Sequence, residues 1–137
     1  MVSDDMMFDI YPIHKDTIIY KTEHSFIFTS DQPLVKYHLL ISPNKIKRRL
    51  KDLDKKEMLD LGKCVMASVK VLKKICGKYT IALQDGKSAG QSVFHLHFHV
   101  IPISKGKIEM ERKKLTHEEM VELANELRPL FNEILNE

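Results

Sequence analysis

Cysteine is scarce in this sequence, and no long apolar segment occurs in it. Cys64 and Cys76 are the two cysteines among 137 residues, and they lack the spacing of zinc ligands. We therefore expect reduced cysteines that serve in packing. No apolar run approaches the roughly 18 residues of a membrane-spanning helix, and no secretory segment is found. These features favour an intracellular, reducing compartment, the cytoplasm or the nucleus, and no membrane partner.

A strong charge of one sign is also missing. The 22 Lys and Arg against 19 Asp and Glu leave a net charge of +3. This excess is too small to argue for a nucleic-acid partner, although it would not repel an anionic ligand. The basic run over 45–51 is interpreted as a solvated connection into a helix. With 43% hydrophobic residues and no internal repeat, we expect one globular domain over 1–137.

Strand-like segments alternate with helical ones along the chain. Runs of β-branched and aromatic residues bounded by turn formers predict strands; they are 17–20, 25–29, 37–41, 79–84 and 93–101. Strands, then a helix, then strands, then a helix favour an α+β domain with an antiparallel sheet. The charged segment 105–114 is interpreted as a solvated loop.

Two capping boxes mark the starts of two main helices. Asp54 with Glu57 precedes an apolar stripe from Met58 to Cys76, and Gly77 is expected to end that helix. Thr116 with Glu119 begins a C-terminal helix over about 116–134. Pro129 is expected to end or kink this second helix, because proline removes a backbone donor.

Three histidines at alternate positions are the sharpest signal in the sequence. His95, His97 and His99 alternate with apolar residues, which is typical of a half-buried strand. One possibility is a strand whose polar face is merely rich in histidine. A metal site is a second possibility, although no Cys, Asp or Glu lies within the strand and His38 would have to complete the ligand set.

Catalysis on a phosphate is the third possibility. Imidazole is a competent nucleophile near neutral pH if its other nitrogen is fixed by an acceptor. Gln91 and Ser92 directly precede the histidines, and the loop from Gly86 to Gly90 can turn backbone amides toward an anion.

The segment 84–102 resembles the signature of the histidine triad family of nucleotide hydrolases and transferases. The pattern of histidine, apolar, histidine, apolar, histidine and two apolars is His95 to Ile101 here, and the likeness extends over 8–102. The segments 20–26 and 84–86 are similar to the fragile histidine triad branch, which cleaves dinucleoside polyphosphates. The segment 91–93 fits the nucleoside phosphoramidase group equally well.

The resemblance implies a fold and an assembly. We expect the family's α+β fold, with a five-stranded antiparallel sheet and two main helices. It also implies a homodimer in which the long helix and a sheet edge pair with their mates.

The resemblance also implies roles for four histidines. His97 would attack the α-phosphate and form a nucleotidyl-histidine intermediate. His99 would contact the phosphate and the leaving atom, and His95 would support His97. His38 matches the family's fourth histidine. No residue is assigned to a metal and no cofactor is required, although a divalent metal can accompany the substrate's phosphates.

Phosphate and nucleoside contacts follow in the same way. Gln84, Gln91 and Ser92 match the phosphate contacts, and Ser92 is placed to help protonate the leaving group. The expected walls of the purine pocket are Phe8, Ile10 and Phe28. The expected ribose ligands are Ser30 and Asp31. Ser30 stands where the family usually has Asp or Asn, and Tyr37 stands where it usually has glycine.

The function implied is hydrolysis of dinucleoside polyphosphates with release of a nucleoside monophosphate. Hydrolysis of nucleoside phosphoramidates or aminoacyl-adenylates is the alternative within enzymes. A nucleotide-binding protein with little catalysis is the alternative outside them.

Overall fold

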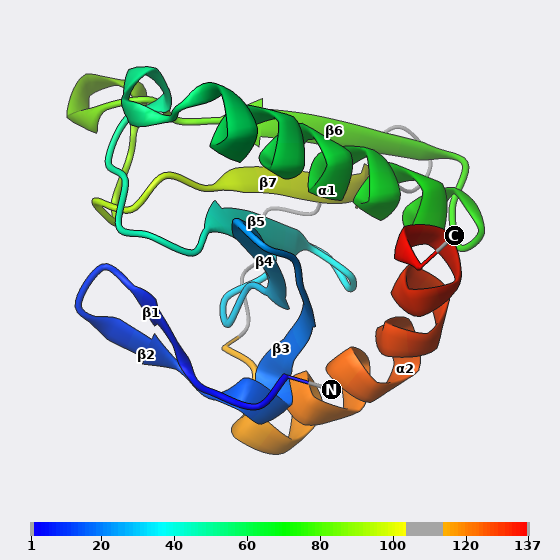
Figure 1. Cartoon of the computed structure of the whole chain (residues 1–137). Helices are drawn as coiled ribbons and strands as arrows, with labels where there is room; N and C mark the ends of the chain where they lie inside the picture. Colours follow the sequence, from blue (N-terminus) through cyan, green and yellow to red (C-terminus); the bar gives the residue numbers. More distant parts are fainter. Residues whose placement is uncertain (1, 104–113, 137) are drawn as a thin grey trace.

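A five-stranded antiparallel sheet forms the centre of the computed structural model, which describes residues 2–103 and 114–136 (Figure 1). The strands run in the order β3-β4-β5-β7-β6. Their bounds are β3 Ile18–Lys21, β4 Ser25–Thr29, β5 Leu39–Pro43, β6 Lys78–Leu83 and β7 Phe98–Ile103. The expected α+β architecture is therefore confirmed.

Helix α1 (Lys55–Lys73) begins at the capping box that the sequence predicted. Asp54 accepts a hydrogen bond from the Glu57 amide, and Glu57 accepts one from the Asp54 amide. The expected end was wrong, because α1 stops before Cys76 and Gly77 has no positive φ. The amide of Cys76 donates instead to the Leu72 carbonyl at 2.7 Å. The last turn is closed without a glycine.

The apolar stripe of α1 lies differently from the prediction. Met58 is 52% exposed, whereas the face of α1 that meets the sheet carries Leu61, Cys64 and Val71. Met58 lies on a second apolar face, which lines a groove with the edge strand β6, and helical periodicity in the sequence merged the two faces.

Helix α2 (His117–Leu135) has the expected Thr116 capping box and packs beside β3. Of the two outcomes expected for Pro129, an end or a kink, the end is excluded, because Pro129 lies inside the helix and α2 continues to Leu135. Proline has no backbone N–H, so one hydrogen bond of the helix is absent at this position. Because Pro129 is exposed, this interruption lies on the solvent side of the helix rather than in the core.

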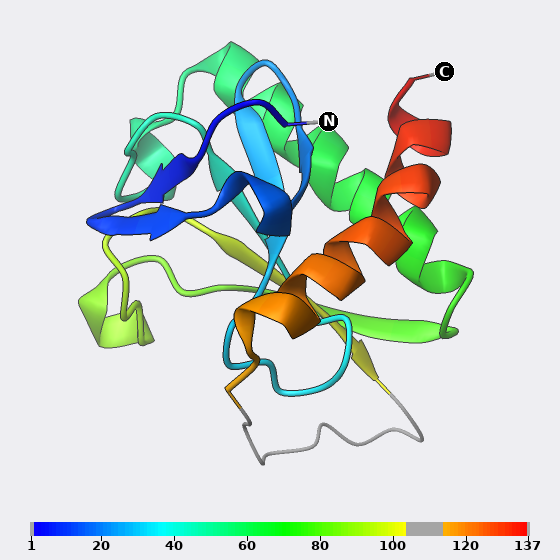
Figure 2. The same cartoon turned by 90° about the horizontal axis from the view of Figure 1, so that it is seen from below.

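The two faces of the sheet are covered by different layers. The helices cover one face, where Ile27, Ile41 and Val100 pack against α1 and α2. A hairpin of β1 (Met6–Phe8) and β2 (Tyr11–Ile13) covers part of the other face (Figures 1 and 2). The sequence did not predict this hairpin, because strands of three residues give no readable alternation.

The histidine segment is only partly a strand, which corrects the expected strand over 93–101. Strand β7 starts at Phe98, so His95 and His97 precede it. The backbone of Leu96 is held from two directions: its amide donates to the Lys47 carbonyl, in the connection before α1, at 2.6 Å. Its carbonyl accepts from the Ser42 hydroxyl at 2.6 Å.

Within the described residues, neither helix is long and apolar enough to cross a membrane. The expected loop over 105–114 falls outside the described residues except for Lys114.

Candidate active site

Strand register brings one histidine of the triad to the hairpin side of the sheet. Phe28 pairs with Leu40, and Leu40 pairs with His99. Directly paired residues of antiparallel strands lie on the same face. His99 therefore shares its face with Phe28 and Leu40, which belong to the hydrophobic cluster beneath the β1–β2 hairpin.

His97 is held by its own stretch of chain. Its Nδ1 lies 2.7 Å from the backbone carbonyl of His95. A carbonyl only accepts, so Nδ1 carries the proton and Nε2 keeps its lone pair. Burial lowers the pKa of His97 below its ordinary value of 6.5, because desolvation disfavours the charged ring. The result is a neutral imidazole with a nucleophilic Nε2.

His99 has the opposite tautomer. The Leu34 amide donates to Nδ1 of His38 at 3.1 Å, so the proton of His38 sits on Nε2. That Nε2 donates to Nδ1 of His99 at 2.9 Å. The proton of His99 is consequently on Nε2, where it can be donated. The rings of His97 and His99 meet edge to face, with centroids 4.9 Å apart.

His95 is buried, with both of its ring nitrogens bonded. Its Nε2 donates to the Pro43 carbonyl at 2.8 Å, and its Nδ1 accepts from the Asp9 amide at 3.0 Å. Burial, and then the nearby His97, lower the pKa of His95. The ring thus fixes the backbone whose carbonyl orients His97.

A cavity of about 420 Å³ lies beside the triad. Its apolar walls include Phe8, Phe28, Leu40 and Val93. Phe8 joins the cavity to the triad, because its ring centroid lies 4.9 Å from that of His97. A planar apolar ligand in the cavity would place an attached group near His97.

The residues expected to contact the nucleoside do not all line the same cavity. Phe8, Phe28 and Asp31 line the cavity. Ser30 instead lines a neighbouring pocket, and its hydroxyl accepts from the Gln32 amide at 3.2 Å. Ile10 is 73% exposed and outside the cavity lining, in which Ile13 is the isoleucine. Ile10 lies in the β1–β2 turn, whereas Ile13 is the last residue of β2.

The loop that precedes the histidines is tied down at both ends. The side chain of Gln91 accepts from the Gly86 amide at 2.9 Å and donates to the Arg48 carbonyl at 2.9 Å. Gln84 packs against Gly90, where a Cβ would lie 2.5 Å from the Gln84 amide nitrogen. Gly90 also has φ +95°, so glycine is needed there for two reasons. Ser92 is exposed.

The basic run before α1 is more than a solvated connection. Arg48 donates to the Phe94 carbonyl at 3.2 Å, and the carbonyl of Lys47 holds Leu96. Arg49 bonds Asp85 at 3.0 Å and holds the pKa of that carboxyl below its usual range. These roles could not be predicted from the sequence, because most of them use backbone carbonyls.

A family model described as the HIT domain matches residues 13–106, well over half of the chain. The chain belongs to the histidine triad family.

Other members of the histidine triad family match over most of the chain. A bis(5'-adenosyl)-triphosphatase of Dictyostelium discoideum is 38% identical, over 90% of this chain and 91% of that protein. The structure of a Plasmodium falciparum diadenosine triphosphate hydrolase in complex with cyclomarin A superposes with a TM-score of 0.83 at 32% identity, covering 97% and 88%. The longer Caenorhabditis elegans NitFhit protein superposes with a TM-score of 0.87 at 34% identity, covering 95% of this chain and 31% of that one.

Tyr37 shows why the family usually has glycine before its fourth histidine. Its φ of 69° lies in the left-handed region, which costs about 1–2 kcal/mol for a residue with a Cβ. The Tyr37 hydroxyl donates to Glu126 at 2.6 Å, and this bond raises the pKa of Tyr37. The contact with α2 offsets part of the strain.

Proposed function

We propose that this protein hydrolyses dinucleoside polyphosphates in two displacements through His97, with release of a nucleoside monophosphate. The membership in the histidine triad family and the relatives named above support this class of reaction. The observation that carries the proposal is the Nε2 lone pair of His97 beside an apolar cavity.

In the first displacement, Nε2 of His97 forms a bond to the α-phosphorus. The bond from that phosphorus to the bridging oxygen breaks, and the remaining nucleoside polyphosphate leaves. Negative charge develops on the leaving oxygen, and the Nε2 proton of His99 stabilises it. The tautomer set by His38 is what makes His99 a donor in this step.

In the second displacement, water attacks the same phosphorus and the N–P bond breaks. The monophosphate leaves, and the Nε2 lone pair of His97 is restored. A covalent intermediate divides one difficult displacement into two easier ones. His95 is a positioning residue in both steps, since its carbonyl fixes the proton of His97 on Nδ1.

Phosphate contacts are proposed for Gln84, Gln91 and Ser92. The side-chain oxygen of Gln91 accepts from the Gly86 amide, and one of its N–H groups donates to the Arg48 carbonyl. The second N–H is therefore the group left for a phosphate. Ser92 is proposed to help protonate the leaving group, and its exposure is compatible with this. A divalent metal is proposed to accompany the substrate's phosphates without a dedicated protein site.

The nucleoside is proposed to occupy the cavity, with its base between Phe8 and Phe28. Asp31 lines the same cavity and is the better placed of the two ribose candidates. Ser30 lies in the neighbouring pocket.

A homodimer is proposed through the second apolar face of α1 and the edge strand β6. A groove between them is lined by Met58, Met66, Val69, Ile81 and Phe98, among others. Met66 and Ile81 are 55% and 44% exposed, and an apolar groove beside an unpaired strand edge is suited to a second copy. Light scattering should give a dimer for the wild type and a monomer for Met66→Lys; a wild-type monomer would contradict the proposal.

An intracellular site of action is proposed as well. Both cysteines are free, and burial raises the pKa of the Cys64 thiol to about 11, which suits a packing role in a reducing compartment.

A paired turnover assay tests the proposed reaction. Diadenosine triphosphate and a fluorogenic adenosine phosphoramidate are given separately to wild type and His97→Ala. We expect fast cleavage of the first substrate by wild type and its loss in the variant. Cleavage of the phosphoramidate alone would favour the alternative hydrolase, and AMP binding without turnover of either would favour a nucleotide-binding protein.

A further inference from the structure

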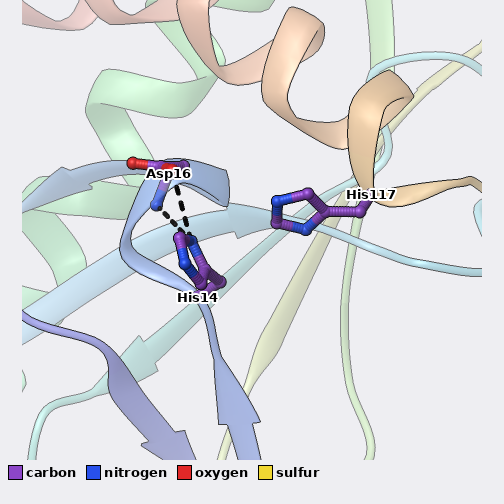
Figure 3. Close-up of side chains that lie close together, drawn as sticks. All are labelled: His14, Asp16 and His117. Carbon is purple, nitrogen blue, oxygen red and sulfur yellow. Dashed lines mark hydrogen bonds and ion pairs between the residues drawn. The ribbon is translucent and has the colours of Figure 1, made fainter.

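Two histidines and an aspartate outside the triad meet at the junction of the hairpin layer and α2. His14 is the N-cap of the 3₁₀ turn η1 (Lys15–Thr17), Asp16 lies in that turn, and His117 is the first residue of α2. One potential ligand atom from each lies within 4.8 Å of the other two. Figure 3 shows the two rings edge to face, with centroids 5.1 Å apart.

The backbone holds the two halves of this cluster in place. Arg128, from α2, donates to the carbonyl of Asp16 at 2.7 Å and to that of Ile18 at 2.8 Å. The Thr17 hydroxyl closes the turn by donating to the His14 carbonyl at 2.8 Å. Because these bonds fix η1 against α2, little backbone ordering is needed before three ligands meet.

The donor set indicates which class of ion fits. Two imidazoles and one carboxylate are the protein ligands of an open zinc site, which leaves one position for water or another ligand. Mg²⁺ and Ca²⁺ prefer oxygen ligands only. The Asp16 carboxylate supplies the negative charge that two neutral imidazoles lack. We propose that His14, Asp16 and His117 bind one divalent transition-metal ion of the Zn²⁺ class.

His14 must adjust for this role, and the structure shows how. Its Nδ1 now accepts the Asp16 amide at 3.1 Å and lies 3.5 Å from the Asp16 carboxylate (Figure 3). If Nδ1 binds the ion, it gives up the hydrogen bond from the Asp16 amide. All three side chains are exposed, so that amide can bond to water instead.

The position gives the site a relation to the cavity. His14 and His117 both line the cavity that also contacts the triad through Phe8. An ion bound by them would lie at the wall of this cavity, and its free coordination position could take water or a bound ligand. The site is independent of the three triad histidines and of His38, and it does not rest on the proposed hydrolysis.

Titration calorimetry with zinc chloride on tag-free protein tests the proposal. We expect one ion per chain for wild type, and affinity at least about tenfold lower in His14→Ala and in His117→Ala. His24→Ala is the matched control, since His24 contacts Glu23 outside the cluster, and should bind as wild type does. Asp16→Asn keeps the side-chain size, removes the charge and should also weaken binding.

Thermal melts provide the second readout. Zinc should raise the Tm of wild type, because the ion ties η1 to α2 in the folded state alone. The rise should vanish in His117→Ala, whose circular dichroism spectrum reports whether it folds. Unchanged zinc affinity in the two histidine variants, loss of binding in His99→Ala instead, or no binding by wild type would each overturn the proposal.

Discussion

His97 and His99 come from one motif, yet the structure prepares them for opposite tasks. Nδ1 of His97 faces the backbone carbonyl of His95, two residues earlier, and must donate a hydrogen bond to it. Nδ1 of His99 faces a donor, Nε2 of His38, from 61 positions away. One ring therefore offers a lone pair at Nε2, and the other offers a proton there.

The difference teaches that the partner, rather than the residue type, decides the role of each histidine. The partner of His97 is local, and the adjacent Leu96 is held by the Lys47 carbonyl and by the Ser42 hydroxyl. The partner of His99 depends on the pairing of β5 with β7 and on the turn that carries Leu34. The two roles should therefore fail separately when their supports are removed.

Removal of the nucleophile should have the largest effect. His97→Asn keeps a small polar side chain but has no imidazole to form the N–P bond, so kcat should fall about 10⁴-fold or more. AMP should still bind with nearly wild-type affinity by calorimetry, because the cavity is intact. A decrease in kcat of less than tenfold would contradict the role of His97 as the nucleophile.

Removal of the support for His99 should have the next largest effect. His38→Ala leaves Nδ1 of His99 without its donor, and kcat should fall about 10- to 100-fold. His38→Gln can return an N–H and should recover part of the loss. Equal losses in the two variants, with equal melting temperatures, would show that His38 acts only by packing.

As the pH falls, His97 should become protonated, and so inactive, at a lower pH than an ordinary histidine. Burial lowers its pKa below 6.5, so the neutral nucleophile persists as pH falls through that value. The acid limb of kcat/KM should lie below pH 6.5. Unfolding should also become easier below pH 6.5, because the unfolded chain binds protons that the buried rings of His95 and His97 resist. An acid limb above pH 6.5 would contradict this account.

The smallest effect is expected from loosening the support of His97. Ser42→Ala removes the buried hydroxyl that bonds the Leu96 carbonyl, at a cost of about 1–2 kcal/mol in the free energy of unfolding. The activity should fall less than tenfold, since the His95 carbonyl stays bonded to His97. Ser3→Ala, at an exposed serine outside the site, is the matched control and should leave both quantities unchanged.

The sequence predicted the elements whose pattern is local. Capping boxes at Asp54 and Thr116 placed both helix starts, and 25–29 matched β4. The helix end near Gly77 failed, because the last turn of α1 closes through the Cys76 amide. The strand over 93–101 failed because alternation cannot show where the ladder to β5 ends, at Phe98.

The sequence predicted candidate residues for the site, but it did not predict which ring nitrogens of the histidines carry protons. Motif resemblance named the four histidines, and strand pairing then brought His38 to His99. The carbonyls of Pro43 and Lys47 carry no side-chain signal in a sequence. The His14–Asp16–His117 cluster joins residues about a hundred positions apart, which only the packing of α2 on η1 reveals.

The most direct test of the central claim is the position of the protons on the two rings. Long-range ¹H–¹⁵N spectra of the free protein at neutral pH, assigned with His97→Asn and His99→Asn, report the tautomer of each histidine. We predict a proton on Nδ1 of His97 and on Nε2 of His99. The same tautomer on both rings, or a proton on Nε2 of His97, would contradict it.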